Sequence, residues 1–254
     1  MKLIDTHAHL DHEKYDKDRE KVIQRNREKL HAVINSGSNP QANQNALKLS
    51  EDYSNFIYPA LGAHPIHVEE FSEKDLERIE KQIRKNSEEI VAVGEIGLDF
   101  HHEKSKDGRD KQKKIFKRFL GVAEELDLPV VTHTRDAEKQ AMEIIDDYDL
   151  EEVVLHCFNG NTNLAEEAVD RGYWISVSTQ VLYSTRVKEI VKVVKTDKIL
   201  LETDSPFLYP GNERNEPYKV EEALEAIADI KTEDKEKLGK QINQNSEKAY
   251  RSEF

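Results

Sequence analysis

Eight short apolar stretches recur along the chain, separated by polar segments. They span residues 3–10, 31–36, 56–64, 90–100, 129–135, 152–158, 173–178 and 198–206. Several are almost continuously apolar and rich in β-branched residues, as at Val130-Val131 and Val153-Val154. This pattern is typical of parallel strands that are buried on both faces. The chain therefore predicts eight buried strands.

The polar segments between these stretches predict helices. They span residues 73–86, 110–126, 137–148, 163–171 and 186–194, and a last helical region over 220–249 would pack outside the strands. Within 116–126 the apolar residues fall at helical spacing. Eight strands alternating with helices predict a (β/α)8 TIM barrel of the α/β class, rather than a doubly wound sheet. We expect residues 1–254 to form this barrel as a single domain.

Composition agrees with one folded domain and limits its partners. Hydrophobic residues make up 37% of the 254 positions and charged residues 35%. No apolar run approaches the roughly 18 residues that a membrane span needs, so we expect no membrane partner. The net charge of −13 argues against a broad nucleic-acid-binding face. It is compatible with a small site that holds one or two phosphates through metal ions, and it leaves the oligomeric state open.

Two features of the chain predict a cytoplasmic location. Cys157 is the single cysteine, so no intrachain disulfide can form and a reducing compartment is the natural one. Met1 and Lys2 lead directly into the first predicted strand, without the apolar segment of a secretion signal.

The first predicted strand carries a pair of metal-binding side chains. Residues i and i+2 of a strand point to the same face, so His7 and His9 project side by side, framed by Asp5 and Asp11 of the same parity. Such a pair suits a divalent cation, although a structural histidine pair is an equal alternative.

Further polar side chains interrupt the apolar strands near their C-terminal ends. With the first pair they form a set of six: His7, His9, Glu95, His133, His156 and Asp204. Taken alone, His133 could be a hydrogen-bonded core residue, Glu95 a paired carboxylate and Asp204 a helix cap. The C-terminal ends of barrel strands meet at one rim, however, and burying this set there without a cation would be costly. The set therefore predicts a metal site.

The six donors exceed what one tetrahedral ion requires. They suffice for two ions that share a carboxylate, and such pairs, about 3.5–4 Å apart, suit phosphoester or amide hydrolysis. We expect Glu95 to bridge them and so to belong to the catalytic centre, since a carboxylate offers one oxygen to each ion. Nitrogen-rich sites favour zinc, manganese or iron over magnesium. Composition alone does not decide the metal, and Mg²⁺, Mn²⁺ and Zn²⁺ all stay open.

Six sequence motifs follow in an order that points to a known family. They are DTHAHLD at 5–11, GAHP at 62–65, GEIGLDF at 94–100, PVVTHTRDA at 129–137, HCFNG at 156–160 and LLETDSP at 200–206. In these motifs the chain resembles the TatD family of metal-dependent hydrolases, a branch of the amidohydrolase superfamily. The resemblance implies a distorted TIM barrel and a metal-dependent deoxyribonuclease, often a 3′-to-5′ exonuclease acting on single-stranded DNA ends. It also implies an allotment of ligands: His7, His9 and Asp204 to one ion, His133 and His156 to the other, and Glu95 to both.

Residues beside the ligands have expected roles in a phosphodiester hydrolysis by a metal-activated hydroxide. Asp204 is the candidate general base. Arg135 shares strand parity with His133 and would clamp a phosphate, unless it forms a surface salt bridge. The family pattern makes His64 a second phosphate contact, and Glu202 would orient a ligand imidazole.

Two other functions stay open at this point. The same two ions could cleave an ester or amide, for example in D-aminoacyl-tRNA. A barrel of this kind could also be a non-catalytic scaffold, which the presence of all six ligands argues against. Of the remaining histidines, His101 and His102 have no assigned role, and we expect His12, His31 and His67 to be surface or structural residues.

Overall fold

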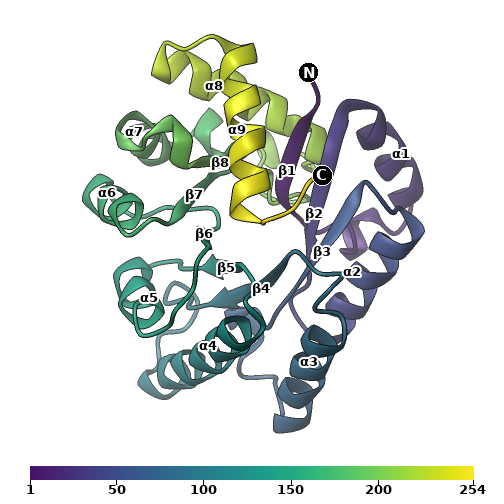
Figure 1. The fold of residues 1–254 in the computed structure, drawn as a ribbon, viewed down its shortest axis with the longest axis vertical. Coiled ribbons are helices and arrows are strands. Elements are labelled where there is room, and N and C mark those ends of the chain that lie inside the picture. The colour runs from purple at the N-terminus through teal and green to yellow at the C-terminus, as the bar shows by residue number, and fades with distance from the viewer.

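The computed structural model describes residues 1–254, apart from the side chain of Asn212. Its eight parallel strands form one sheet in chain order (Figure 1). The strands are β1 (Leu3–Ala8), β2 (Leu30–Ser36), β3 (Ile57–Leu61), β4 (Ala92–Gly97), β5 (Val130–His133), β6 (Val153–Leu155), β7 (Trp174–Val177) and β8 (Ile199–Leu201). A parallel bridge between Ala8 and Ser205 joins β1 to the segment after β8 and nearly closes the sheet. The predicted TIM barrel is confirmed.

Helices surround the strands (Figure 1). They are α1 (Arg19–Lys29), α2 (Pro40–Asp52), α3 (Glu73–Lys85), α4 (Lys106–Leu126), α5 (Glu138–Ile145), α6 (Thr162–Asp170), α7 (Thr185–Val193), α8 (Val220–Lys231) and α9 (Lys235–Ala249). Side-chain caps set several starting points. The Ser105 side chain accepts from Gly108 N, so α4 begins at Lys106, earlier than the predicted residue 110. No helix of the described residues is both long and apolar enough to span a membrane.

The strands are buried on both faces, which explains their continuous apolar sequences. One cluster takes a residue from each strand of β2 to β8: Ile34, Ala60, Ala92, Val131, Val154, Trp174 and Leu200. Strand residues of the other parity, such as Val33 and Val93, belong to a larger cluster with the surrounding helices. The first cluster fills the barrel, so the C-terminal rim is left for polar side chains.

The helical region predicted over 220–249 is two helices. Thr232 adopts a left-handed φ of 55° at the end of α8, and Asp234 caps the start of α9. The second helix crosses the N-terminal end of the barrel (Figure 1), where Asn245 Nδ2 donates to Ile199 O at 2.8 Å and Tyr250 Oη donates to Thr6 O at 3.1 Å. Helix α9 therefore closes the end of the barrel opposite the polar rim.

Candidate metal centre

Glu95 lies at the centre of the histidines that β1, β5 and β6 bring to the C-terminal rim. Its side chain is 1% exposed. Glu95 Oε2 lies 3.3 Å from His7 Nε2, whereas Oε1 lies 2.8 Å from His133 Nδ1 and 3.6 Å from His156 Nε2. The two carboxylate oxygens thus face different sets of imidazoles.

His7 at the end of β1 and His9 just after it point into the same space, as their spacing in the sequence predicts. Their Nε2 atoms are 3.2 Å apart. Asp204 Oδ1 lies 3.4 Å from His9 Nε2 and 3.9 Å from His7 Nε2, and the Asp204 N–H donates to His7 O at 2.9 Å. Two imidazole nitrogens and a carboxylate oxygen around one point form a donor set that fits a divalent cation. All six predicted ligands are therefore brought together.

The other ring nitrogens of this histidine pair are held by Ser36 at the end of β2. The Nδ1 of His9 lies 2.9 Å from Ser36 O, and that of His7 lies 3.2 Å from Ser36 Oγ. A proton on Nδ1 of His9 leaves the lone pair of Nε2 free for a cation. Ser36 belongs to this site although its sequence context gave no indication of it.

Asp99 is a second residue that sequence reasoning missed. It is 1% exposed, and its Oδ2 lies 3.0 Å from His133 Nε2 and 2.9 Å from His102 Nδ1. Its backbone N–H donates to Gln112 Oε1 at 2.9 Å, which fixes the loop after β4. This arrangement leaves His133 Nδ1 facing Glu95. The available signal was its place in the GEIGLDF motif, four residues after Glu95.

Glu202 lies beneath His156 and is fully buried. Its Oε2 lies 2.9 Å from His156 Nδ1 and accepts from Ser176 Oγ at 2.6 Å, while Oε1 accepts from Cys157 N at 2.7 Å. The carboxylate therefore accepts a hydrogen bond from His156 Nδ1–H, so that in the neutral ring Nε2 carries the lone pair toward Glu95. The structure thus places Glu202 against the imidazole of one predicted ligand, His156.

His64 also reaches the centre, but the ring nitrogen that it turns toward Glu95 is the one that carries the proton. Its Nδ1 accepts the backbone N–H of Ile66 at 3.0 Å, so the proton of the neutral ring is on Nε2. That Nε2 lies 3.1 Å from Glu95 Oε1. Burial lowers the pKa of His64 to about 4, which keeps the ring neutral. Although His64 and Glu95 lie close enough to share an ion with His133, Nε2 of His64 is a hydrogen-bond donor rather than a ligand.

The charges within the cluster shift the pKa values of its members. Burial by itself raises the pKa of Glu95, but the surrounding imidazoles outweigh burial and hold that pKa well below its usual range. Burial lowers the pKa of His9, yet its hydrogen bond and charge interaction with Asp204 raise it to about 9. Against the same effect of burial, the charges of Glu202 and Glu95 raise the pKa of His156 to about 10. The carboxylates thus attract positive charge, as a metal site requires.

Arg135 is exposed and borders a small cavity of about 120 Å³ over the centre. The cavity is also lined by His133, Thr134, Glu138, His156, Cys157, Asn159, Gln180, Asp204 and Leu208. The guanidinium of Arg135 and the carboxylate of Asp204 thus line the same cavity.

The remaining histidines lie outside the group of ligands. His101 is 47% exposed and its Nδ1 is 3.1 Å from Asp136 Oδ2. His31 is exposed on β2, His12 Nδ1 accepts the Lys14 N–H, and His67 lies beside Glu70.

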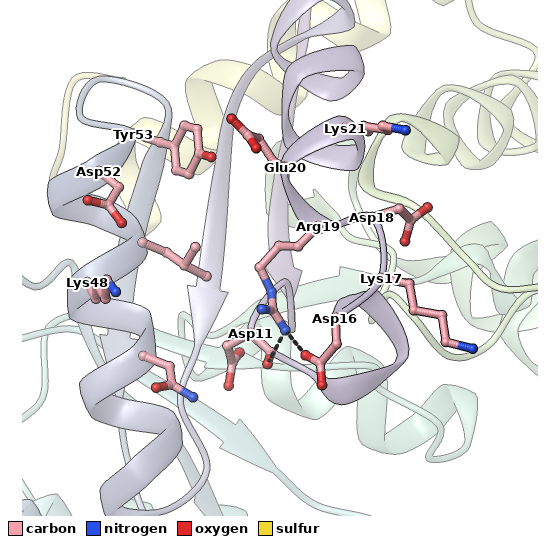
Figure 2. A pocket seen from close by; sticks show the side chains of 12 residues that line it. Asp11, Asp16, Lys17, Asp18, Arg19, Glu20, Lys21, Lys48, Asp52 and Tyr53 are labelled. Carbon is pink, nitrogen blue, oxygen red and sulfur yellow. Dashed lines mark hydrogen bonds and ion pairs between the residues drawn. The ribbon is translucent and has the colours of Figure 1, made fainter.

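A larger cavity of about 560 Å³ lies away from this centre, between α1 and α2 (Figure 2). Its wall mixes basic and acidic side chains, such as Lys48 and Asp52 on α2. Arg19 of α1 donates to Asp16 Oδ1 and to the carbonyl oxygen of Leu10, so its guanidinium is already bound. None of the predicted site residues lines this cavity.

Comparison with known proteins identifies the family. The sequence model of the family described as TatD related DNase matches residues 4–251. This chain belongs to the TatD-related DNase family. Within the TatD family it is 36% identical to the uncharacterized metal-dependent hydrolase YabD of Bacillus subtilis (strain 168), over 98% of this chain and 99% of YabD.

Other TatD relatives have more specific names. The chain is 30% identical to deoxyribonuclease TATDN3 of Homo sapiens, covering 98% of this chain and 94% of TATDN3. It is 29% identical to the 3′-5′ ssDNA/RNA exonuclease TatD of Pantoea ananatis (strain LMG 20103), covering 98% and 99%. The crystal structure of YJJV, a TatD homologue from Escherichia coli k12, matches with a TM-score of 0.91 at 27% identity and covers 99% of this chain and 98% of that one. The protein is a TatD-family, metal-dependent hydrolase with clusters of histidine and glutamate suited to metal ions.

Proposed function

We propose that this protein is a deoxyribonuclease that uses two divalent metal ions to remove nucleotides from the 3′ ends of single-stranded DNA. The observation that carries the proposal is the position of Glu95 between two sets of imidazoles. Its Oε2 lies 3.3 Å and 3.9 Å from the Nε2 atoms of His7 and His9, and its Oε1 faces His133 and His156. A carboxylate so placed can give one oxygen to each of two ions, the arrangement suited to phosphodiester hydrolysis.

The donor set fits such ions. The ligands of one would be His7, His9 and Asp204, those of the other His133 and His156, with Glu95 shared. Imidazole-rich donors favour Zn²⁺ or Mn²⁺, and the carboxylates also admit Mg²⁺. When bound, these ions would lower the pKa of a water molecule and offset the charge that develops on the phosphate oxygens.

The residues of the chain would orient the substrate and move protons around the ions. The Asp204 side chain is 15% exposed toward the cavity and can accept a proton there. Arg135 at the edge of that cavity can bind two phosphate oxygens at once. The Ile66 N–H fixes the proton of His64 on Nε2, which lies 3.1 Å from Glu95 Oε1 and would have to turn from that carboxylate to donate to a phosphate oxygen.

Substrate and polarity rest on the relatives as well as on the site. TATDN3 is named a deoxyribonuclease and the Pantoea protein a 3′-5′ ssDNA/RNA exonuclease, each about 30% identical to this chain over nearly its whole length. The net charge of −13 agrees with recognition of a few phosphates at a chain end rather than of a long duplex.

A cleavage assay on single-stranded DNA labelled at its 5′ end tests the proposal. Chelator-treated protein should be inactive, and Mg²⁺, Mn²⁺ or Zn²⁺ should restore a ladder of products that shorten from the 3′ end. Glu95→Gln should lose this activity. Glu152→Gln is the matched control, because Glu152 accepts from Trp174 Nε1 at the other end of β6. Metal-independent cleavage, or a fully active Glu95→Gln protein, would contradict the proposal. Hydrolysis of D-aminoacyl-tRNA with no effect on DNA would assign the centre to an ester substrate instead.

A further inference from the structure

We propose that the ring of Phe207 is a stacking surface for an unpaired base of the substrate, with Lys14 beside it to bind a backbone phosphate. This inference rests on the proposed function and narrows it. It makes Phe207 a specificity-determining residue for single-stranded ends.

Phe207 lies directly beside the metal centre. It follows Asp204 by three residues, and its backbone N–H donates to Asp204 O at 2.9 Å. The ring centroid lies 6.3 Å from the imidazole of His9, one of the proposed ligands. A nucleotide whose phosphate is bound at the centre therefore has its base within reach of this ring.

The loop that carries Phe207 is fixed. Its carbonyl oxygen accepts from Asn215 Nδ2 at 2.7 Å, and the same amide group donates to Thr203 O at 3.0 Å. Asn215 is fully buried, and the oxygen of its backbone accepts from Tyr15 Oη at 2.6 Å. Because the backbone is held in place, little conformational entropy would be lost when a base binds to the ring.

The ring is partly exposed and is in contact with a cation. Phe207 is 36% exposed, among the few large apolar side chains that are exposed. Its aromatic neighbours meet it at steep angles, His12 at 84° and His9 at 67°, rather than by parallel stacking. Lys14 Nζ lies over the ring, 4.5 Å from its centroid, so a base that stacks on this face would displace the ammonium group toward the backbone phosphate. A partly exposed aromatic ring in contact with a basic side chain is a combination with which proteins bind single-stranded nucleic acids.

This surface would select against paired ends. A base in a duplex stacks on its neighbours and is not free to stack on a protein ring without fraying. An unpaired end has no such cost, so the ring would favour single strands whatever the identity of the base.

Kinetics with a base-free nucleotide test the inference. The substrates are a single-stranded oligonucleotide and the same oligonucleotide with abasic residues at the terminal two positions where cleavage starts. The wild-type protein should have a KM for the abasic end higher by about fivefold to about a hundredfold. Phe207→Leu should lose this difference, whereas Phe207→Tyr should keep it. Val193→Ala is the control, since Val193 on α7 is 37% exposed and distant in sequence from the site loops.

Lys14→Gln tests the cation separately. Loss of one phosphate contact should reduce the salt dependence of binding, with a change in the log–log slope of about 0.7. The inference is overturned if the wild-type protein does not distinguish intact from abasic ends, or if Phe207→Leu distinguishes them as well as the wild type. In both cases the nuclease activity would stand. If the wild-type protein cleaves neither oligonucleotide with any metal, the proposed function fails first.

Discussion

Replacing Glu202 with glutamine would test how the buried carboxylate fixes the imidazole of His156. Three donors converge on this carboxylate: His156 Nδ1 at 2.9 Å, Cys157 N at 2.7 Å and Ser176 Oγ at 2.6 Å. The Cys157 donor is a backbone N–H and cannot reverse its polarity. The oxygen of the new amide must therefore face Cys157, so its NH₂ group faces His156.

The consequence for His156 is a change of tautomer. An NH₂ group 2.9 Å away needs an acceptor at Nδ1, so the ring proton moves to Nε2, the nitrogen that faces Glu95 at 3.6 Å. His156 Nε2 then has no lone pair for the ion. The ring can keep that lone pair only if its Nδ1–H and the new NH₂ group face each other and stay unpaired. Changes of such outer residues typically cost about 10- to 100-fold in metal affinity, which is about 1.4–2.7 kcal/mol.

Titration with Zn²⁺ or Mn²⁺ against a competing chelator measures this loss. Glu152→Gln serves as the control because Glu152 also accepts a hydrogen bond, from Trp174 Nε1, at the opposite end of the barrel. Circular dichroism should show both variants folded. If Glu202→Gln binds metal within threefold of the wild type, the tautomer argument is refuted.

Two further substitutions and the pH dependence of metal binding have expected outcomes. Gly97 has a φ of 144°, and a Cβ there would lie 2.0 Å from His133 O. Gly97→Ala should therefore lower the free energy of unfolding, measured by urea denaturation, by about 1–3 kcal/mol. The loss should exceed that of Gly172→Ala, where φ is 90° and nothing lies within 4 Å; equal losses would exclude the clash. Because the pKa of His156 is raised to about 10 in the metal-free centre, metal binding at pH 7 should release protons, and metal affinity should increase as pH rises toward that pKa. Calorimetry in two buffers of different ionisation enthalpy counts these protons. Binding heats that do not depend on the buffer would contradict this expectation. Arg135→Lys should lower kcat/KM on DNA about tenfold, since lysine cannot bind two phosphate oxygens in a fixed geometry; an unchanged value would remove Arg135 from the site.

The barrel could be predicted because its physical cause is local in sequence. Strands such as β5 and β6 are buried on both faces, so Val130-Val131 and Val153-Val154 are apolar without alternation. The placement of polar residues at one rim then follows from the parallel direction of the strands. The break between α8 and α9 could not be predicted in this way, because it depends on a left-handed residue, Thr232, that has no strong preference for that conformation.

The ligands could be predicted as a set, but not the residues that orient them. Asp99 follows Gly97, whose positive φ ends the regular strand. Strand parity therefore does not predict the direction of the Asp99 side chain. Which ring nitrogen of His64 carries the proton depends on a turn in which the Ile66 N–H donates to Nδ1. Ser36 binds the His7 and His9 pair through its place on the neighbouring strand, which only the folded barrel defines.

Anomalous diffraction from crystals grown with Mn²⁺ or Zn²⁺ tests the central claim most directly, because it locates each ion and identifies the element. We expect two peaks, one on each side of Glu95, with Oε2 and Oε1 as the shared ligands. The first should be bound by His7, His9 and Asp204, and the second by His133 and His156. A single ion that does not contact Glu95, or an ion bound by Nε2 of His64, would contradict this account.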